Sequence, residues 1–106
     1  MRLGLSSAAA PDAPLDELLA ACVRRGLEVL ELRDGDGHGV SEGPDAVGGA
    51  EARRRALEAG VTLSGFRAES DGSDLRLARL AVAAEAPVLV GCGCSMAFRI
   101  ERARRL

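Results

Sequence analysis

The chain alternates between short apolar runs bounded by turn residues and longer stretches in which apolar residues recur every three or four positions. The clearest short run is LEVLEL at 27–32, bounded by Gly26 on one side and by Asp34-Gly35 on the other. Runs of this length, punctuated in this way, are typical of a strand inside a parallel sheet. We therefore predict a buried strand over 28–32.

The clearest helical pattern lies just before that strand. Asp16 and Glu17 suit the positive end of a helix dipole, and Gly26 suits the position after the last helical residue. The pattern therefore predicts a helix that starts near Pro14 and ends at Arg25. One apolar face of this helix comprises Leu15, Leu18, Leu19, Cys22 and Val23.

The same alternation continues to the end of the chain. It predicts strands at 1–5, 28–32, 61–66 and 86–90, and helices at 14–25, from 47 or 49 to 59, and at 73–85. For the last of these helices, Ser73 is the expected N-cap, and the expected buried stripe is Leu77, Leu80, Ala81 and Ala84. A β-α-β-α-β-α-β order predicts the α/β class, with parallel β-α repeats and right-handed crossovers. An open sheet and consecutive units of a (β/α) barrel both fit this order.

Composition and charge narrow the function classes. The chain has 106 residues, of which 47% are hydrophobic and 2% aromatic, so we expect one modest core built from Leu, Val and Ala. The formal net charge of −2 argues against nucleic acid or a membrane surface as a partner. We read the RRR run at 53–55 and the basic tail as solvated helix surface. With three cysteines and no targeting or membrane-spanning segment visible, a cytoplasmic location is expected.

Polar side chains gather where two of the predicted strands end. Glu31, Arg33, Asp34, Asp36 and the only histidine, His38, belong to the second strand end, while Arg67 and Glu69 follow the third. In α/β folds, binding and catalytic groups sit at the carboxyl ends of the strands. Any site should therefore include this edge.

Other motifs in the sequence are weaker indicators of function. The loop DGDGHG lacks the spacing and the final Glu of a calcium loop, and no GK[ST] follows to make a phosphate cradle. Cys92-Gly93-Cys94 could hold a soft metal or act in redox chemistry, but zinc sites prefer C-x₂-C spacing and four ligands. Incidental cysteines are the alternative reading.

Three segments carry a family resemblance: MRLGLSS followed by PLDELLAACVRRGLEVLELR, the loop DGDGHGV, and RRRALEAGVTLSGFRAE followed by DLRLARLAVAAEAPVLV. In order and spacing, positions 1–90 resemble the N-terminal half of the sugar phosphate isomerase/epimerase family, the xylose isomerase-like TIM barrels. The resemblance implies a half (β/α) barrel over 1–91 with about four strands, followed by a divergent tail at 92–106 with a weak helical pattern. A complete barrel needs roughly 250 residues.

Members of this family use a divalent metal for isomerase or epimerase chemistry, with metal ligands from the later strands. The resemblance therefore implies a truncated chain that lacks the metal-binding half, holds no cofactor of its own, and has no independent isomerase activity. It implies a small-molecule partner in carbohydrate metabolism, a sugar or sugar phosphate. The substrate-binding residues would be Glu31, Arg33, His38 and Arg67.

Two alternatives of a different class remain at this point. A four-stranded parallel sheet leaves two unpaired edges, so the chain could be a non-enzymatic α/β module that forms a homodimer through them. A third hypothesis is a small metal-binding protein that uses Cys92 and Cys94.

Overall fold

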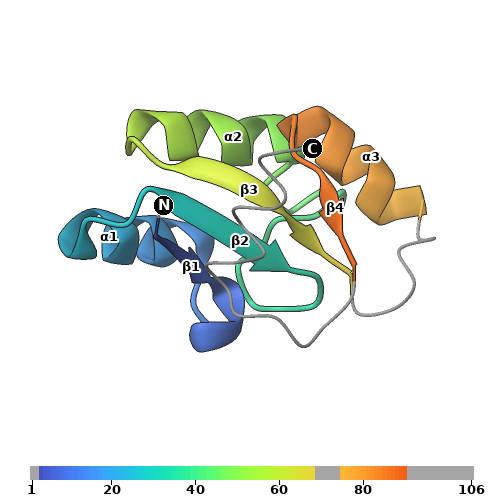
Figure 1. Ribbon diagram of the computed structural model, residues 1–106. Helices are drawn as coiled ribbons and strands as arrows, with labels where there is room; N and C mark the ends of the chain where they lie inside the picture. The colour runs from blue at the N-terminus through green and yellow to red at the C-terminus, as the bar shows by residue number, and fades with distance from the viewer. Residues whose placement is uncertain (1–2, 69–74, 91–106) are drawn as a thin grey trace.

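The computed structural model of the protein describes residues 3–68 and 75–90, which form four strands, three α-helices and one short 3₁₀ helix. Their bounds are β1 Gly4–Ser6, η1 Ser7–Ala9, α1 Leu15–Arg25, β2 Val29–Arg33, α2 Gly49–Glu58, β3 Thr62–Arg67, α3 Leu75–Ala84 and β4 Val88–Leu89. All neighbouring strands are parallel, and their order is β1-β2-β3-β4. The predicted α/β class with parallel β-α units is confirmed, and the described strands form an open sheet rather than a closed barrel (Figure 1).

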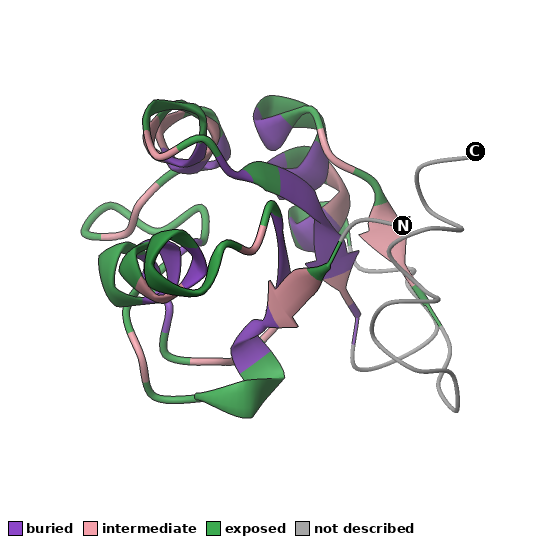
Figure 2. Ribbon diagram, turned by 60° about the vertical axis from the view of Figure 1, so that its left-hand side comes forward, coloured by how far each residue is buried: buried purple, intermediate pink, exposed green. Residues whose placement is uncertain are grey.

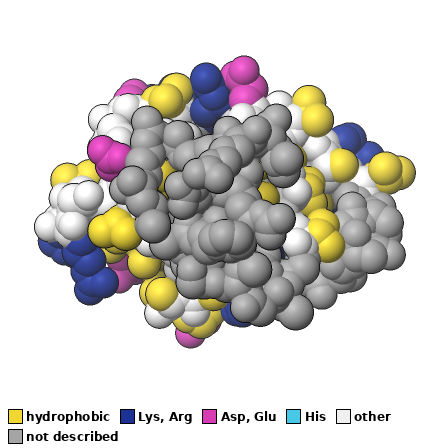
Figure 3. Space-filling view, viewed as in Figure 1, with side chains coloured by type: hydrophobic (Ala, Val, Ile, Leu, Met, Phe, Trp, Pro, Cys, Tyr) yellow, Lys and Arg dark blue, Asp and Glu magenta, His cyan; other side chains and the backbone are white. Residues whose placement is uncertain are grey.

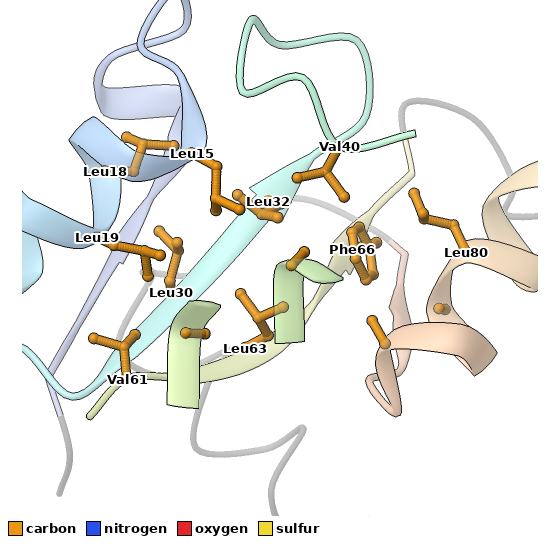
Figure 4. Close-up of a cluster of buried hydrophobic side chains, with 14 of the residues drawn as sticks. Leu15, Leu18, Leu19, Leu30, Leu32, Val40, Val61, Leu63, Phe66 and Leu80 are labelled. Carbon is orange, nitrogen blue, oxygen red and sulfur yellow. The ribbon is translucent and has the colours of Figure 1, made fainter. Parts of the chain in front are cut away.

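All three α-helices cover the same face of the sheet. Leu30 and Leu32 of β2 point toward them, and the core between the two layers is built mainly from leucine, alanine and valine, with Phe66 added (Figure 4). Crossovers of one hand between neighbouring strands place every helix on one side, which explains the two-layer arrangement. Buried residues accordingly concentrate along the strands and the inner sides of the helices (Figure 2).

The first helix follows the predicted bounds. Gly26 ends α1 in the left-handed conformation with φ 68°, as expected for the residue after the helix. Four residues of the predicted stripe are buried, but Val23 is 58% exposed, so its assignment to the core was wrong. Val23 lies eight positions after Leu15, which turns it to the edge of the apolar face at 100° per residue. Pro14 is the N-cap rather than a residue of the first turn.

The strand β3 carries one extra residue relative to β2. Leu30 pairs with Leu63, but the next residue, Glu31, pairs with Gly65. Ser64 is the extra residue, and its hydroxyl donates a hydrogen bond to the carbonyl oxygen of Leu30 at 3.3 Å. This is a β-bulge, which shifts the alternation of side chains between the two faces.

The bulge decides which side chains of β3 face the helices. Strict alternation would place Leu63 and Arg67 on one face and Phe66 on the other. With the extra residue, Leu63 and Phe66 both enter the core (Figure 4). Arg67 lies on the opposite face, beside Glu31.

The predicted stripe of α3 is confirmed, since Leu77, Leu80, Ala81 and Ala84 are all buried. Several other predictions fall outside the described residues: the strand start at 1–2, Glu69, the N-cap Ser73, and the tail 92–106 with Cys92 and Cys94. Within the part of the chain that the structure describes, no helix has the length and apolar character needed to cross a membrane.

The helices α2 and α3 approach closely at Gly49, the first residue of α2. A Cβ atom at this position would lie 2.5 Å from the carbonyl oxygen of Leu80 and 3.0 Å from the amide nitrogen of Ala84. Both atoms belong to the backbone of α3, so the clash could be relieved only by moving one helix.

We therefore expect Gly49→Ala to lower the free energy of unfolding by about 1–3 kcal/mol, because overpacking outweighs the better helix propensity of alanine. The matched control is Gly48→Ser at the N-cap of the same helix, where an added Cβ meets nothing within 4 Å. Serine is a good N-cap, so this variant should be neutral or slightly more stable. Urea unfolding of the two variants measures the difference, and equal stability would contradict the close packing at Gly49.

Candidate functional site

The carboxyl ends of β2 and β3 bring Glu31 and Arg67 together. Glu31 lies between Leu30 and Leu32 in sequence, so its side chain is on the sheet face opposite the helices. Arg67 donates from Nε to Oε2 of Glu31 at 3.1 Å and from Nη2 to Oε1 of the same carboxylate. Glu31 is fully buried, and the side chain of Arg67 is 14% exposed. This bidentate geometry gives the strongest hydrogen bonding between an arginine and a carboxylate.

A second group lies at the ends of β1 and β2. Asp36 accepts hydrogen bonds from Nε and Nη2 of Arg33 at 3.1 and 2.8 Å, and from the hydroxyl of Ser7 at 2.6 Å. The Ser7 hydroxyl oxygen also accepts a hydrogen bond from the backbone amide of Arg33 at 2.7 Å. These contacts tie the loop after β2 to the residues that follow β1.

His38 fixes the base of the same loop. Its Nδ1 accepts a hydrogen bond from the backbone amide of Val40 at 3.0 Å, so the proton of the neutral ring sits on Nε2, 2.9 Å from the carbonyl oxygen of Arg33. The backbone carbonyl of His38 also accepts from the first amide of α1, at Leu15. His38 is buried, and both ring nitrogens are used within the protein.

The four residues predicted as substrate-binding therefore form two adjacent pairs, Glu31 with Arg67 and Arg33 with His38. The pairs adjoin because Arg33 and Arg67 are partners in the parallel register, and the amide of Asp34 donates to the carbonyl of Arg67 at 2.8 Å. Arg33 and Arg67 have exposed side-chain surface, whereas Glu31 and His38 are buried.

Asp36 was predicted to lie at this edge without a role of its own, and Ser7 was not among the predicted site residues. Both are central to the network around Arg33. The signal that could have found Ser7 is its position directly after the first strand, since the rule about carboxyl ends applies to every parallel strand.

The geometry does not form a nucleophilic triad. Ser7 is oriented by Asp36, and the Nε2 proton of His38 is directed to a backbone carbonyl. No group of three or more His, Cys, Asp or Glu side chains that could hold a metal ion occurs among residues 3–68 and 75–90. Cys22 is buried on α1 as predicted, and burial raises the pKa of its thiol. At this edge, Ser7 and His38 are therefore engaged in hydrogen bonds within the protein.

A pocket of about 210 Å³ lies elsewhere, between the later halves of α2 and α3 and the start of β3. Its polar residues include Arg53 and Glu85, which form an ion pair with 3.2 Å between Nε of Arg53 and Oε2 of Glu85. The pocket opens at the amino-terminal end of β3, so it is separate from the carboxyl-end edge.

The basic run at 53–55 lies on an ion-paired surface, where Arg54 is exposed and Arg53 and Arg55 are partly exposed. Arg54 pairs with Glu51 and Glu58, and Arg55 pairs with Glu51 and Asp16. Basic and acidic side chains lie beside one another at the top of Figure 3, where α2 lies in Figure 1. Hydrogen bonds from the two arginines lower the pKa of Glu51 to about 2.

Comparison with known proteins does not assign the chain to a family. No protein-family model matches the sequence, and no curated protein matches it significantly. The function must therefore be argued from the residues at the sheet edge.

The network around Asp36 makes a prediction about pH. Burial by itself would raise the pKa of Asp36, but the hydrogen bonds from Arg33 and Ser7 and the charge of Arg33 hold it below its ordinary value of 3.8. A carboxyl group whose folded-state pKa is lowered stabilises the protein above its unfolded pKa and loses this contribution as the pH falls through the folded value.

We expect wild type to exceed Asp36→Asn in stability by about 1–3 kcal/mol at neutral pH, as is usual for hydrogen bonds to a charged group. The gap should stay constant down to about pH 4 and close below it. Urea unfolding of both proteins across this range measures the gap. A gap that is independent of pH would contradict the ionised network.

Proposed function

We propose that this chain supplies the substrate-contacting wall of a sugar phosphate isomerase/epimerase-like (β/α) barrel. The observation that carries the proposal is the pair Glu31 and Arg67, which joins two neighbouring parallel strands at their carboxyl ends. Arg33 lies next to this pair and has an exposed side-chain surface. The resemblance over 1–90 supports the same edge, since it implies substrate contacts there.

In this proposal, the two arginines contact the sugar or sugar phosphate, and the buried groups hold them in place. Glu31 fixes the guanidinium group of Arg67, and Asp36 fixes that of Arg33. His38 is hydrogen-bonded to the backbone carbonyl of Arg33 and so helps to position this residue. The divalent metal used by the family would bind to residues of later barrel strands, so the chain by itself binds ligand without converting it. A cytoplasmic location is part of the proposal.

Replacement of Arg67 by lysine tests this function, because lysine keeps the charge and loses the forked donor geometry. We expect a ketohexose, its 6-phosphate, or both to shift the amide resonances of Asp34 and Arg67 in the wild-type chain. Arg67→Lys should weaken that binding about tenfold, the cost of about one charged hydrogen bond. Titration of the ¹⁵N-labelled chain by NMR gives both the affinity and the location.

The control is Arg24→Lys, in the last turn of α1 at the opposite end of the sheet, which should leave the affinity unchanged. Thermal unfolding confirms that both variants fold. The same wild-type sample, supplied with Mg²⁺ or Mn²⁺, should not isomerise either sugar. Failure of both sugars to bind at this edge would refute the proposed function, and metal-dependent turnover by this chain would refute the division of roles.

A second candidate function is self-association into a non-enzymatic assembly. The outer strands β1 and β4 each have one neighbour among the described strands. Leu3 and Val90, which adjoin these strands, are 58% and 51% exposed. A two-fold axis parallel to the strands would pair β4 of each copy with β1 of the other and keep every strand parallel, which gives eight strands in a ring.

If the edges pair in this way, light scattering should report a dimer, and the double variant Leu3→Glu with Val90→Glu should be monomeric, because charges at a sheet edge oppose strand pairing. The matched control is Val82→Glu on the outer face of α3, where the valine is 77% exposed and distant from both edges. This control should remain dimeric. A monomeric wild type at high protein concentration would eliminate this candidate.

A further inference from the structure

Both arginines of the candidate site are held by carboxylates. Arg67 donates through Nε and Nη2 to the two oxygens of Glu31. Arg33 donates through the same two atoms to Oδ1 of Asp36, at 3.1 and 2.8 Å. Each guanidinium group therefore carries its counter-ion within the protein, and a ligand meets two ion pairs rather than two uncompensated cations.

Asp36 is ionised at neutral pH. The pKa of Asp36 is lowered despite its burial, because Arg33 and Ser7 both donate to the carboxylate. Among the described residues at the ends of β2 and β3, two guanidinium groups thus contact two carboxylates, those of Glu31 and Asp36.

This charge balance distinguishes between two kinds of ligand. A phosphate ester carries close to two negative charges at neutral pH. It therefore binds more tightly to an arginine that has no counter-ion, and less tightly beside carboxylates, which repel it. The hydroxyl groups of a neutral sugar can accept from the exposed parts of the guanidinium groups and donate to carboxylate or carbonyl oxygens. Alternating donors and acceptors of this kind match a polyol without any need for net charge.

We infer that the site at the ends of β2 and β3 binds a neutral sugar or polyol in preference to its phosphate ester. This inference rests on the proposed function and narrows it to one substrate class. Glu31 and Asp36 are the specificity-determining residues, since each cancels the charge of the arginine that it positions.

The first test needs no variant. The ¹⁵N-labelled chain is titrated separately with a ketohexose, with the 6-phosphate of the same ketohexose, and with inorganic phosphate, at constant ionic strength. We expect the neutral sugar to bind about tenfold more tightly than its phosphate, a difference of about 1.4 kcal/mol. Inorganic phosphate should leave the amides of Asp34 and Arg67 unshifted.

Removal of one counter-ion should reverse the preference. Asp36→Asn keeps the side-chain shape but removes the negative charge that Asp36 places against Arg33, so the phosphate ester should gain about tenfold relative to the neutral sugar. Glu31→Gln should act in the same direction through Arg67. The matched control is Glu51→Gln on α2, which changes the net charge equally but removes an exposed carboxylate away from the strand ends.

The outcomes separate the inference from the proposed function. Tighter binding of the phosphate ester by wild type would overturn the inference and leave the proposed function intact. Absence of binding by both sugars would overturn both. Thermal unfolding shows whether Asp36→Asn and Glu31→Gln fold. If they do not fold, the relative affinities of the wild-type chain for the ketohexose and its 6-phosphate decide whether the inference holds.

Discussion

The bulge at Ser64 is the constraint on which the candidate site depends. One extra residue in β3 lets Leu63 and Phe66 share the core face, although an odd number of positions separates them. The same residue turns Arg67 to the opposite face, where it meets Glu31. Without the bulge, burial of Leu63 and pairing of Arg67 with Glu31 would require opposite registers, because a slip of one residue exchanges the two faces of a strand.

The pair formed by Glu31 and Arg67 would be costly if only one partner were present. Glu31 is fully buried, and a buried carboxylate is tolerated when a charged, hydrogen-bonded partner compensates its lost hydration. A buried ion pair is weak evidence of a contribution to stability. The proposed function therefore assigns this pair a binding role.

Hydrogen bonds, together with the burial of Val40 in the core, hold the loop after β2 in place. His38, Asp36 and Ser7 each make two or more contacts that join this loop to the strand ends and to the start of α1. This explains how a loop rich in glycine presents Arg33 in a defined position. It also changes the interpretation of His38, whose prominence as the only histidine suggested a ligand contact, while the structure gives both of its ring nitrogens a role in the backbone of the loop.

The sequence by itself determined the strands, the helices and the class of fold, because the apolar periodicities of α1 and α3 and the run before Arg33 are local patterns that match their burial. It also indicated the edge at which polar groups gather. The tertiary structure alone decided which of them meet. The pairing of Arg67 with Glu31 depends on a bulge in β3. The role of Ser7 depends on the neighbouring positions of β1 and β2. Each of these is a relation between residues distant in sequence, and local patterns do not contain it.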